Sequence, residues 1–154
     1  MKTTLLLVIP FFSFLALVVN AAEPFAPTTS LEPEQVLAIQ LEALQHNDRP
    51  YADAGIAQIW AFAHPANRMY TGPLSRFMAM LKAPAYRGLL GHHRHSIELM
   101  RREERSATFL VTVQTGDSRA LGYKWTVEKV EDGEFAGCWM TSGVSRAAQL
   151  GDVI

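Results

Sequence analysis

The placement of proline constrains the fold of this chain more than any other feature. All eight prolines lie at or before Pro84, and the remainder of the 154 residues holds none. Proline lacks the backbone N–H that a central strand must donate, whereas helix starts and turns tolerate it. After Pro84 apolar and polar residues alternate with a period of two, which is typical of strands. The sequence therefore predicts an α+β domain in which helices precede a sheet.

Three helices are expected before residue 85. The first begins at Pro33, because proline is favoured at the first position of a helix. In all three, apolar side chains recur at helical spacing, so one side of each helix should face a core. The predicted ranges are 33–46, about 53–64 and about 74–83, and a short helical turn is expected at 86–90.

Four strands are expected after that turn, at 93–100, 109–114, 121–128 and about 135–144. The connections between them are short and polar, and Asp132-Gly133 is a strong hairpin signal, so the sheet should be an antiparallel meander. The clean alternation predicts that one face packs on the helices, with Trp125 on that face. The domain should span 33–147, after a lead-in at 22–32 and before a tail at 148–154. Cys138 should be a buried thiol in an apolar stretch; an intermolecular link is the alternative.

The first residues are typical of a secretory signal peptide. Lys2 precedes an apolar run at 5–19, and the small residues Ala21 and Ala22 follow it. The run is shorter than the roughly 20 apolar residues of a spanning helix. We expect cleavage after residue 21 or 22, no stable membrane span afterwards, and a secreted or secretory-lumen protein. A signal anchor and an algal-type plastid reached through the secretory route are the alternatives.

Composition excludes several classes of function. Lys and Arg number 14 against 15 Asp and Glu, so no basic excess exists to bind nucleic acid. A single cysteine excludes a cysteine-based zinc site. His93 and His95 share one side of a strand, but no motif supplies a third ligand, so no metal is expected. Phosphate-binding loops and nucleophile-elbow motifs are missing from the sequence as well, and no cofactor is predicted.

The candidate site is predicted from the residues that should lie close together between the helices and the sheet. His95 has the parity of the helix-facing side of its strand, and Asp53 opens the second helix. These two are weak candidates for acid–base catalysis; the alternative is a helix cap and a core histidine. Arg68, Arg76 and Arg87 could gather an anionic ligand at the rim of the pocket; the alternative is that they are solvated. The residues expected to line a pocket are Trp60, Tyr70, Tyr86, His95, Tyr123 and Trp125.

Four stretches carry a resemblance to a known family. They are 40–48 (QLEALQHND), 61–68 (AFAHPANR), 72–77 (GPLSRF) and 137–141 (GCWMT). Together they resemble the family called domain of unknown function 4864, which is similar in plan to the nuclear transport factor 2-like, or cystatin-like, α+β cone. The resemblance covers about residues 33–144. It implies helices over a curved sheet with a pocket between them, and it implies no reaction.

Two classes of function follow. The first is a non-catalytic module with a cone-type pocket that binds a small apolar or weakly anionic ligand, or another protein; a homodimer is compatible with this class. The second is a small cofactor-independent isomerase or hydratase with His95 as general base. An open pocket that holds His95 beside a carboxylate would favour the enzyme.

Overall fold

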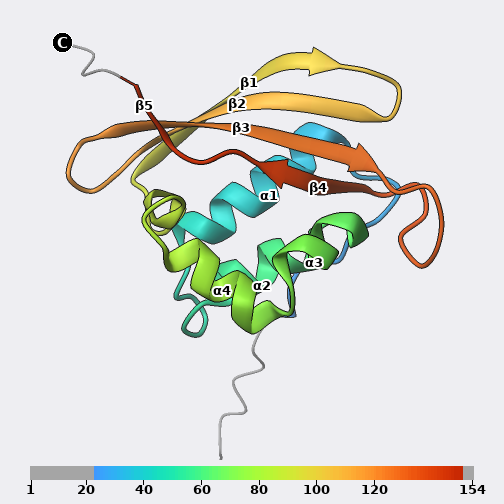
Figure 1. The fold of residues 1–154 in the computed structure, drawn as a ribbon, viewed down its shortest axis with the longest axis horizontal. Coiled ribbons are helices and arrows are strands. Elements are labelled where there is room, and N and C mark those ends of the chain that lie inside the picture. Colours follow the sequence, from blue (N-terminus) through green and yellow to red (C-terminus); the bar gives the residue numbers. More distant parts are fainter. Residues whose placement is uncertain (1–22, 151–154) are drawn as a thin grey trace, which may run out of the picture.

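The computed structural model describes residues 23–150, so the predicted signal peptide lies outside the described residues. Helices come first and strands second (Figure 1). The helices are α1 (Pro33–Gln45), α2 (Ala54–Ala61), α3 (Pro65–Thr71), α4 (Leu74–Lys82) and the 3-10 turn η1 (Arg87–Leu89). The strands are β1 (Arg94–Arg102), β2 (Ser106–Gln114), β3 (Ala120–Lys129), β4 (Trp139–Val144) and β5 (Ala148–Leu150). The predicted α+β order is confirmed.

The sheet is an open antiparallel meander. Its strands follow the order β1-β2-β3-β4, and every neighbouring pair is antiparallel. The edge of β3 that faces away from β2 has two partners. The strand β4 pairs with the second half of β3, and the short β5 pairs with its first three residues. The meander agrees with the short polar connections in the sequence.

Among residues 23–150, the helices cover one face of this sheet and leave the other without a helix (Figure 1). On the covered face Phe109 lies opposite Trp125, and Val111 lies opposite Tyr123; all four are buried. On the other face Lys124 is exposed. Trp125 therefore faces the helices, as its parity predicted, and belongs to the same core as the apolar residues of α1, α2 and α4.

Four helices precede the sheet within residues 23–150, where the sequence predicted three. The predicted second helix runs from about 53 to 64, just before Pro65, but α2 ends at Ala61 and Pro65 begins α3. The reason is local: proline suits the first turn of a helix, and the ring of His64 accepts a hydrogen bond from the backbone N–H of Ala66 (3.1 Å).

The end of the sheet also differs from the prediction. The strand β4 starts at Trp139 rather than near residue 135, because residues 134–137 form a turn in which Gly137 has a positive φ of 81°. The segment assigned to a tail contributes β5 at Ala148–Leu150.

Cys138 is buried, as predicted, with 5% of its surface exposed. It packs with Val130, Met140 and the half-buried Phe135 in a small cluster beside the main core. Burial raises the pKa of its thiol, because the thiolate form loses its hydration. Since this is the chain's one cysteine, it forms no disulfide within the chain.

Candidate functional site

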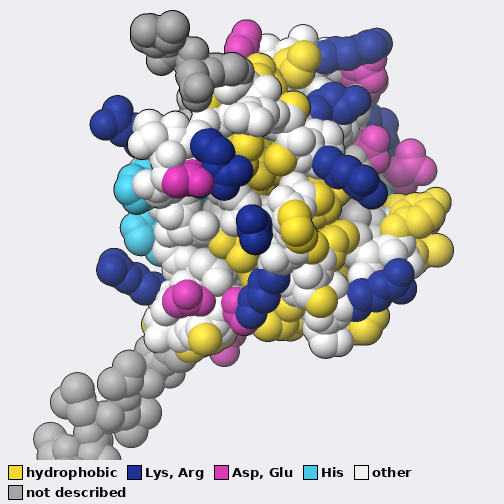
Figure 2. Space-filling view, turned by 60° about the vertical axis from the view of Figure 1, so that its left-hand side comes forward, with side chains coloured by type: hydrophobic (Ala, Val, Ile, Leu, Met, Phe, Trp, Pro, Cys, Tyr) yellow, Lys and Arg dark blue, Asp and Glu magenta, His cyan; other side chains and the backbone are white. Residues whose placement is uncertain are grey.

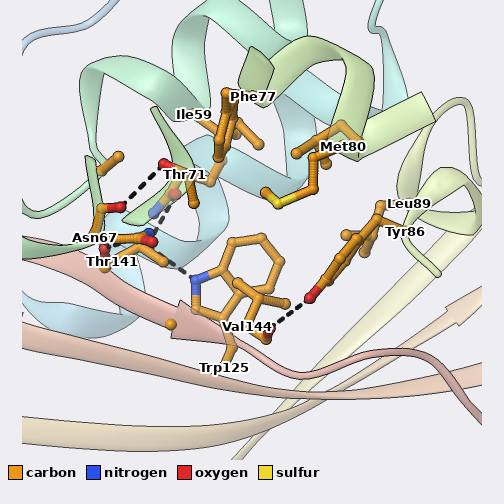
Figure 3. A pocket seen from close by; sticks show the side chains of 14 residues that line it. Ile59, Asn67, Thr71, Phe77, Met80, Tyr86, Leu89, Trp125, Thr141 and Val144 are labelled. Atoms are coloured by element: carbon orange, nitrogen blue, oxygen red, sulfur yellow. Dashed lines mark hydrogen bonds between the residues drawn. The ribbon is translucent and has the colours of Figure 1, made fainter. Parts of the chain in front are cut away.

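A cavity of about 150 Å³ lies between the helices and the sheet (Figure 3). Apolar side chains from α2, α4 and η1 form most of its wall, and the ring of Trp125 on β3 forms its floor. Thr71 and Asn67 of α3 stand at one side, and Tyr86 stands at the other. The full lining is Gln40, Ile59, Ala63, Asn67, Thr71, Phe77, Met80, Leu81, Tyr86, Leu89, Trp125, Thr141, Gly143 and Val144.

One end of the cavity is polar, because a buried chain of hydrogen bonds lies there. The indole N–H of Trp125 donates to Oγ1 of Thr141 (2.9 Å), and that hydroxyl donates to Oε1 of Gln40 (2.9 Å). The amide of Gln40 in turn donates to the carbonyl of Val36 one helical turn earlier (3.1 Å). Buried polar groups that are paired in this way hold their side chains in one geometry.

Thr141 also joins β4 to the helices. Its backbone N–H donates to the carbonyl of Phe62 (2.8 Å), and its carbonyl accepts from the backbone N–H of His64 (2.8 Å). The side-chain amide of Asn67 donates to the same carbonyl (3.2 Å). The end of α2, the start of α3 and β4 are therefore tied at one residue, which fixes this wall of the cavity.

The opposite wall brings η1 close to the end of β4. The hydroxyl of Tyr86 donates to the carbonyl of Val144 (3.3 Å), and the backbone N–H of Ala147 donates to the carbonyl of Ala85 (3.1 Å). Tyr86 and Val144 are half-buried, so they stand where the cavity meets the surface.

Basic side chains flank this part of the surface. Arg87 follows Tyr86 and Arg146 precedes Ala147; both are exposed. Within residues 23–150 neither has a carboxylate within 4.0 Å, since the ion pairs there involve other residues. On the side of the molecule that Figure 2 brings forward, hydrophobic side chains surface between Lys and Arg side chains.

The six aromatic and histidine residues expected to share a pocket are separated in the structure. Tyr86 and Trp125 line the cavity. Trp60 is half-buried beside it and packs on Phe77 with 5.1 Å between ring centroids. Tyr70 is 84% exposed, Tyr123 is buried without lining the cavity, and His95 lines a different hollow.

Arg68 does not reach the rim to which the sequence assigned it. It donates from Nη2 to the carbonyls of Trp60 and Ala61, each at 3.0 Å, and so caps the last turn of α2. Its guanidinium lies over the ring of Trp60, 5.2 Å from the centroid. Burial lowers the pKa of Arg68. Arg76 and Arg87 are exposed.

Asp53 holds α2 to α4. It stands at the N-cap position of α2 without making a side-chain cap, and its carboxylate binds Nζ of Lys82 at 2.6 Å. The hydrogen bond from Lys82 is the main cause that lowers the pKa of Asp53, and Asn47 donates a second one (3.2 Å). Asp53 and His95 therefore have different partners, because His95 binds the ring of His92.

Tyr123 offers a test of burial. Its ring is 1% exposed, its hydroxyl has no hydrogen-bond partner among residues 23–150, and desolvation raises its pKa from 10.0 to about 12. We expect Tyr123→Phe to keep or raise the free energy of unfolding, by up to about 1 kcal/mol, because a buried unpaired hydroxyl is costly. Urea unfolding at neutral pH checks this. Tyr86→Phe, which loses a bonded hydroxyl, is the control and should destabilise.

The same shift sets a pH dependence. The pKa of Tyr123 is higher in the folded chain than in the unfolded chain, so the unfolded chain loses this proton first as the pH rises. The contribution of Tyr123 to the free energy of unfolding is therefore complete below about pH 10 and is lost as the pH rises through about 12. The loss of stability between these values should be smaller in Tyr123→Phe than in the unaltered chain. Equal losses in both would contradict the burial of this hydroxyl.

Residues 23–150 hold no group of three or more His, Cys, Asp or Glu arranged to bind a metal ion. Of the helices described, none is both long and apolar enough to cross a membrane. No family model, no curated protein and no solved structure matches the chain.

Proposed function

We propose that the protein is a small-ligand-binding module of the secretory pathway, and that the cavity between its helices and sheet is the binding site. The observation that carries this is the apolar cavity of about 150 Å³ with one hydrogen-bonded polar end. An apolar cavity of this size accommodates a benzene ring. The core side chains do not fill it, which favours a ligand over a purely structural role.

The ligand class follows from the lining. Ile59, Phe77 and Leu89 suit an apolar ring, and the exposed Arg87 and Arg146 beside Tyr86 and Val144 suit a negative charge at the surface. We therefore expect a compact aromatic or cyclic compound that carries an acidic group. The arrangement of helices over one face of an open sheet supports the proposed relationship to the cone superfamily. The pattern of residues 1–22 supports the secretory location.

His95 does not enter this proposal as a base in the cavity. It lines another hollow and binds His92, while Asp53 is held by Lys82. The isomerase or hydratase alternative needed these two side chains together beside the pocket. The contacts favour binding over that reaction.

Binding can be tested with two probes of one shape, benzoate and benzyl alcohol, followed by calorimetry and ligand-detected NMR. We expect both to bind, and a saturating probe at about 100 times its Kd should stabilise the fold by about 2.7 kcal/mol. Met80→Trp should abolish binding, because Met80 points into the cavity (Figure 3) and a larger side chain would fill it. Met69→Trp is the matched control, since Met69 is 83% exposed and should leave binding unchanged.

Comparison of the charged probe with the neutral one tests whether Arg87 and Arg146 attract a negative charge to the cavity. Arg87→Gln combined with Arg146→Gln should weaken benzoate about two- to fivefold and leave benzyl alcohol unchanged, as expected for exposed charges. Equal binding of both probes by Met80→Trp and by the unaltered chain would reject the cavity as the site.

A further inference from the structure

Three groups form a line of hydrogen bonds at the start of β1. The Nδ1 atom of His92 is 2.7 Å from the carbonyl oxygen of Leu89, and its Nε2 atom is 2.8 Å from Nδ1 of His95. The two rings meet edge to face, with 5.0 Å between centroids and 72° between planes. His92 is 2% exposed, whereas His95 is partly exposed.

This geometry fixes the protons of both rings. A carbonyl oxygen only accepts, so Nδ1 of His92 carries the proton that it donates to Leu89. Burial lowers the pKa of His92 and keeps the ring neutral, so its Nε2 has a lone pair. That atom then accepts the N–H at Nδ1 of His95. Nε2 of a neutral His95 is left unprotonated and is the one ring nitrogen free to meet a ligand.

His95 borders a broad hollow of about 640 Å³ that is separate from the cavity described above. The lead-in and the outer sides of α1 and α2 form this hollow, and much of its wall is apolar, including Phe25, Ile39 and Tyr51. The charged and titratable groups that line it besides His95 are Glu23, Glu42, His46, Arg49 and Tyr51. Glu42 and His46 of α1 also act electrostatically on His92.

We propose that His95 is the nucleophile of a second site, which takes the acyl group of a small ester with an apolar body, and that His92 is its positioning residue. A nucleophile that is hydrogen-bonded to a second side chain, which a third group orients in turn, is an arrangement that activates nucleophiles in enzymes. Here His95 is the nucleophile, His92 accepts its N–H, and the Leu89 carbonyl orients His92.

The step balances with solvent water as the second reactant. Nε2 of His95 bonds to the acyl carbon, and the bond to the ester oxygen breaks, so the alcohol oxygen leaves with the electron pair and takes a proton from water. The proton on Nδ1 of His95 stays in the hydrogen bond to Nε2 of His92, which stabilises the positive charge of the acylated ring. The hydroxide left by that water attacks the acyl carbon, the acid leaves, and His95 is neutral again with its proton at Nδ1. Ester and water give acid and alcohol.

The test uses 4-nitrophenyl acetate with the full chain, followed by the release of 4-nitrophenolate and by peptide mass spectrometry. The exposed His93 is the internal reference, because its ring has no hydrogen bond to another side chain among residues 23–150. We expect the acetyl group on His95 at a rate at least about tenfold above that on His93, because the hydrogen bond to His92 stabilises the charge that forms on the acylated ring. Equal rates would overturn the proposal.

Two variants separate positioning from simple exposure. His92→Gln keeps a donor for the Leu89 carbonyl and an acceptor for His95, so it should retain most of the excess rate. His92→Leu offers neither and should remove it. An excess rate that survives His92→Leu would overturn the role of His92.

A spectroscopic measurement keeps the test decisive even if His92→Leu does not fold. Imidazole ¹⁵N spectra of the unaltered chain should show both His92 and His95 protonated at Nδ1 and unprotonated at Nε2. A proton on Nε2 of neutral His95 would overturn the proposal. Met80→Trp should leave acetylation unchanged, so failure of this site and failure of the ligand cavity are distinguishable.

Discussion

Trp125→Ala is expected to lower the free energy of unfolding by about 3–5 kcal/mol, the range for truncation of a buried large aromatic side chain. Trp125 is 1% exposed and lies at the centre of the face that packs on the helices. Its loss would enlarge the existing cavity of about 150 Å³ and remove the donor to Thr141. Urea unfolding followed by circular dichroism measures the change without relying on the indole fluorescence.

A second variant separates packing from hydrogen bonding at this position. Trp125→Phe keeps an aromatic ring but removes the N–H that Thr141 accepts, while Thr141 still donates to Gln40. We expect a loss of about 1–2 kcal/mol, since one neutral hydrogen bond and part of the ring are gone. A loss below about 1 kcal/mol for Trp125→Ala would contradict the assignment of this face to the core.

The fold could be predicted from the sequence where one local rule acted alone. The period-two pattern placed Trp125 on the helix-facing side, because a shift of one residue would move the apolar side chains of the strand to the opposite face. Pro33 marked the start of α1 correctly. The prediction failed at α3 for two reasons. Proline can either follow one helix or begin the next, so Pro65 did not reveal the start of α3. In addition, α3 has seven residues, too few for a clear apolar pattern.

The cavity was harder to predict, because its lining comes from segments far apart in the chain. Thr141 and Gln40 are 101 residues apart, and their contact depends on how β4 crosses α1. One signal was present: Gln40 is a polar residue on the apolar side of its helix, and such a residue needs a buried partner.

His92 was missed for a different reason. It precedes β1, so the alternation that describes His95 says nothing about it. Its burial depends on η1, whose Leu89 carbonyl accepts from the ring. A histidine three residues after a helical turn carries no pattern that distinguishes this contact from solvent exposure.

The close packing of α1 against α2 depends on the lack of a side chain at Gly55. Its backbone N–H donates to the carbonyl of Asn47 (2.9 Å), and the N–H of Ile56 donates to Oδ1 of the same residue (3.1 Å). Asn47, rather than the side chain of Asp53, therefore satisfies the N–H groups of Gly55 and Ile56 in the first turn of α2. A Cβ at residue 55 would overlap the carbonyl oxygen of Ala43 and lie 2.9 Å from Cα of Asn47.

Gly55→Ala is therefore expected to destabilise the fold by about 3 kcal/mol, the upper part of the usual range for overpacking. The obstacle is backbone of α1, which cannot turn aside as the end of a side chain can, so the helices must separate and lose both bonds to Asn47. Urea unfolding measures the loss. Gly116→Ala is the matched control: its Cβ would meet only His93, at an ordinary 3.6 Å. That variant should match the unaltered chain or gain up to about 1 kcal/mol through the lower entropy of its unfolded state. Similar stability in both variants would contradict the close approach of α1 and α2.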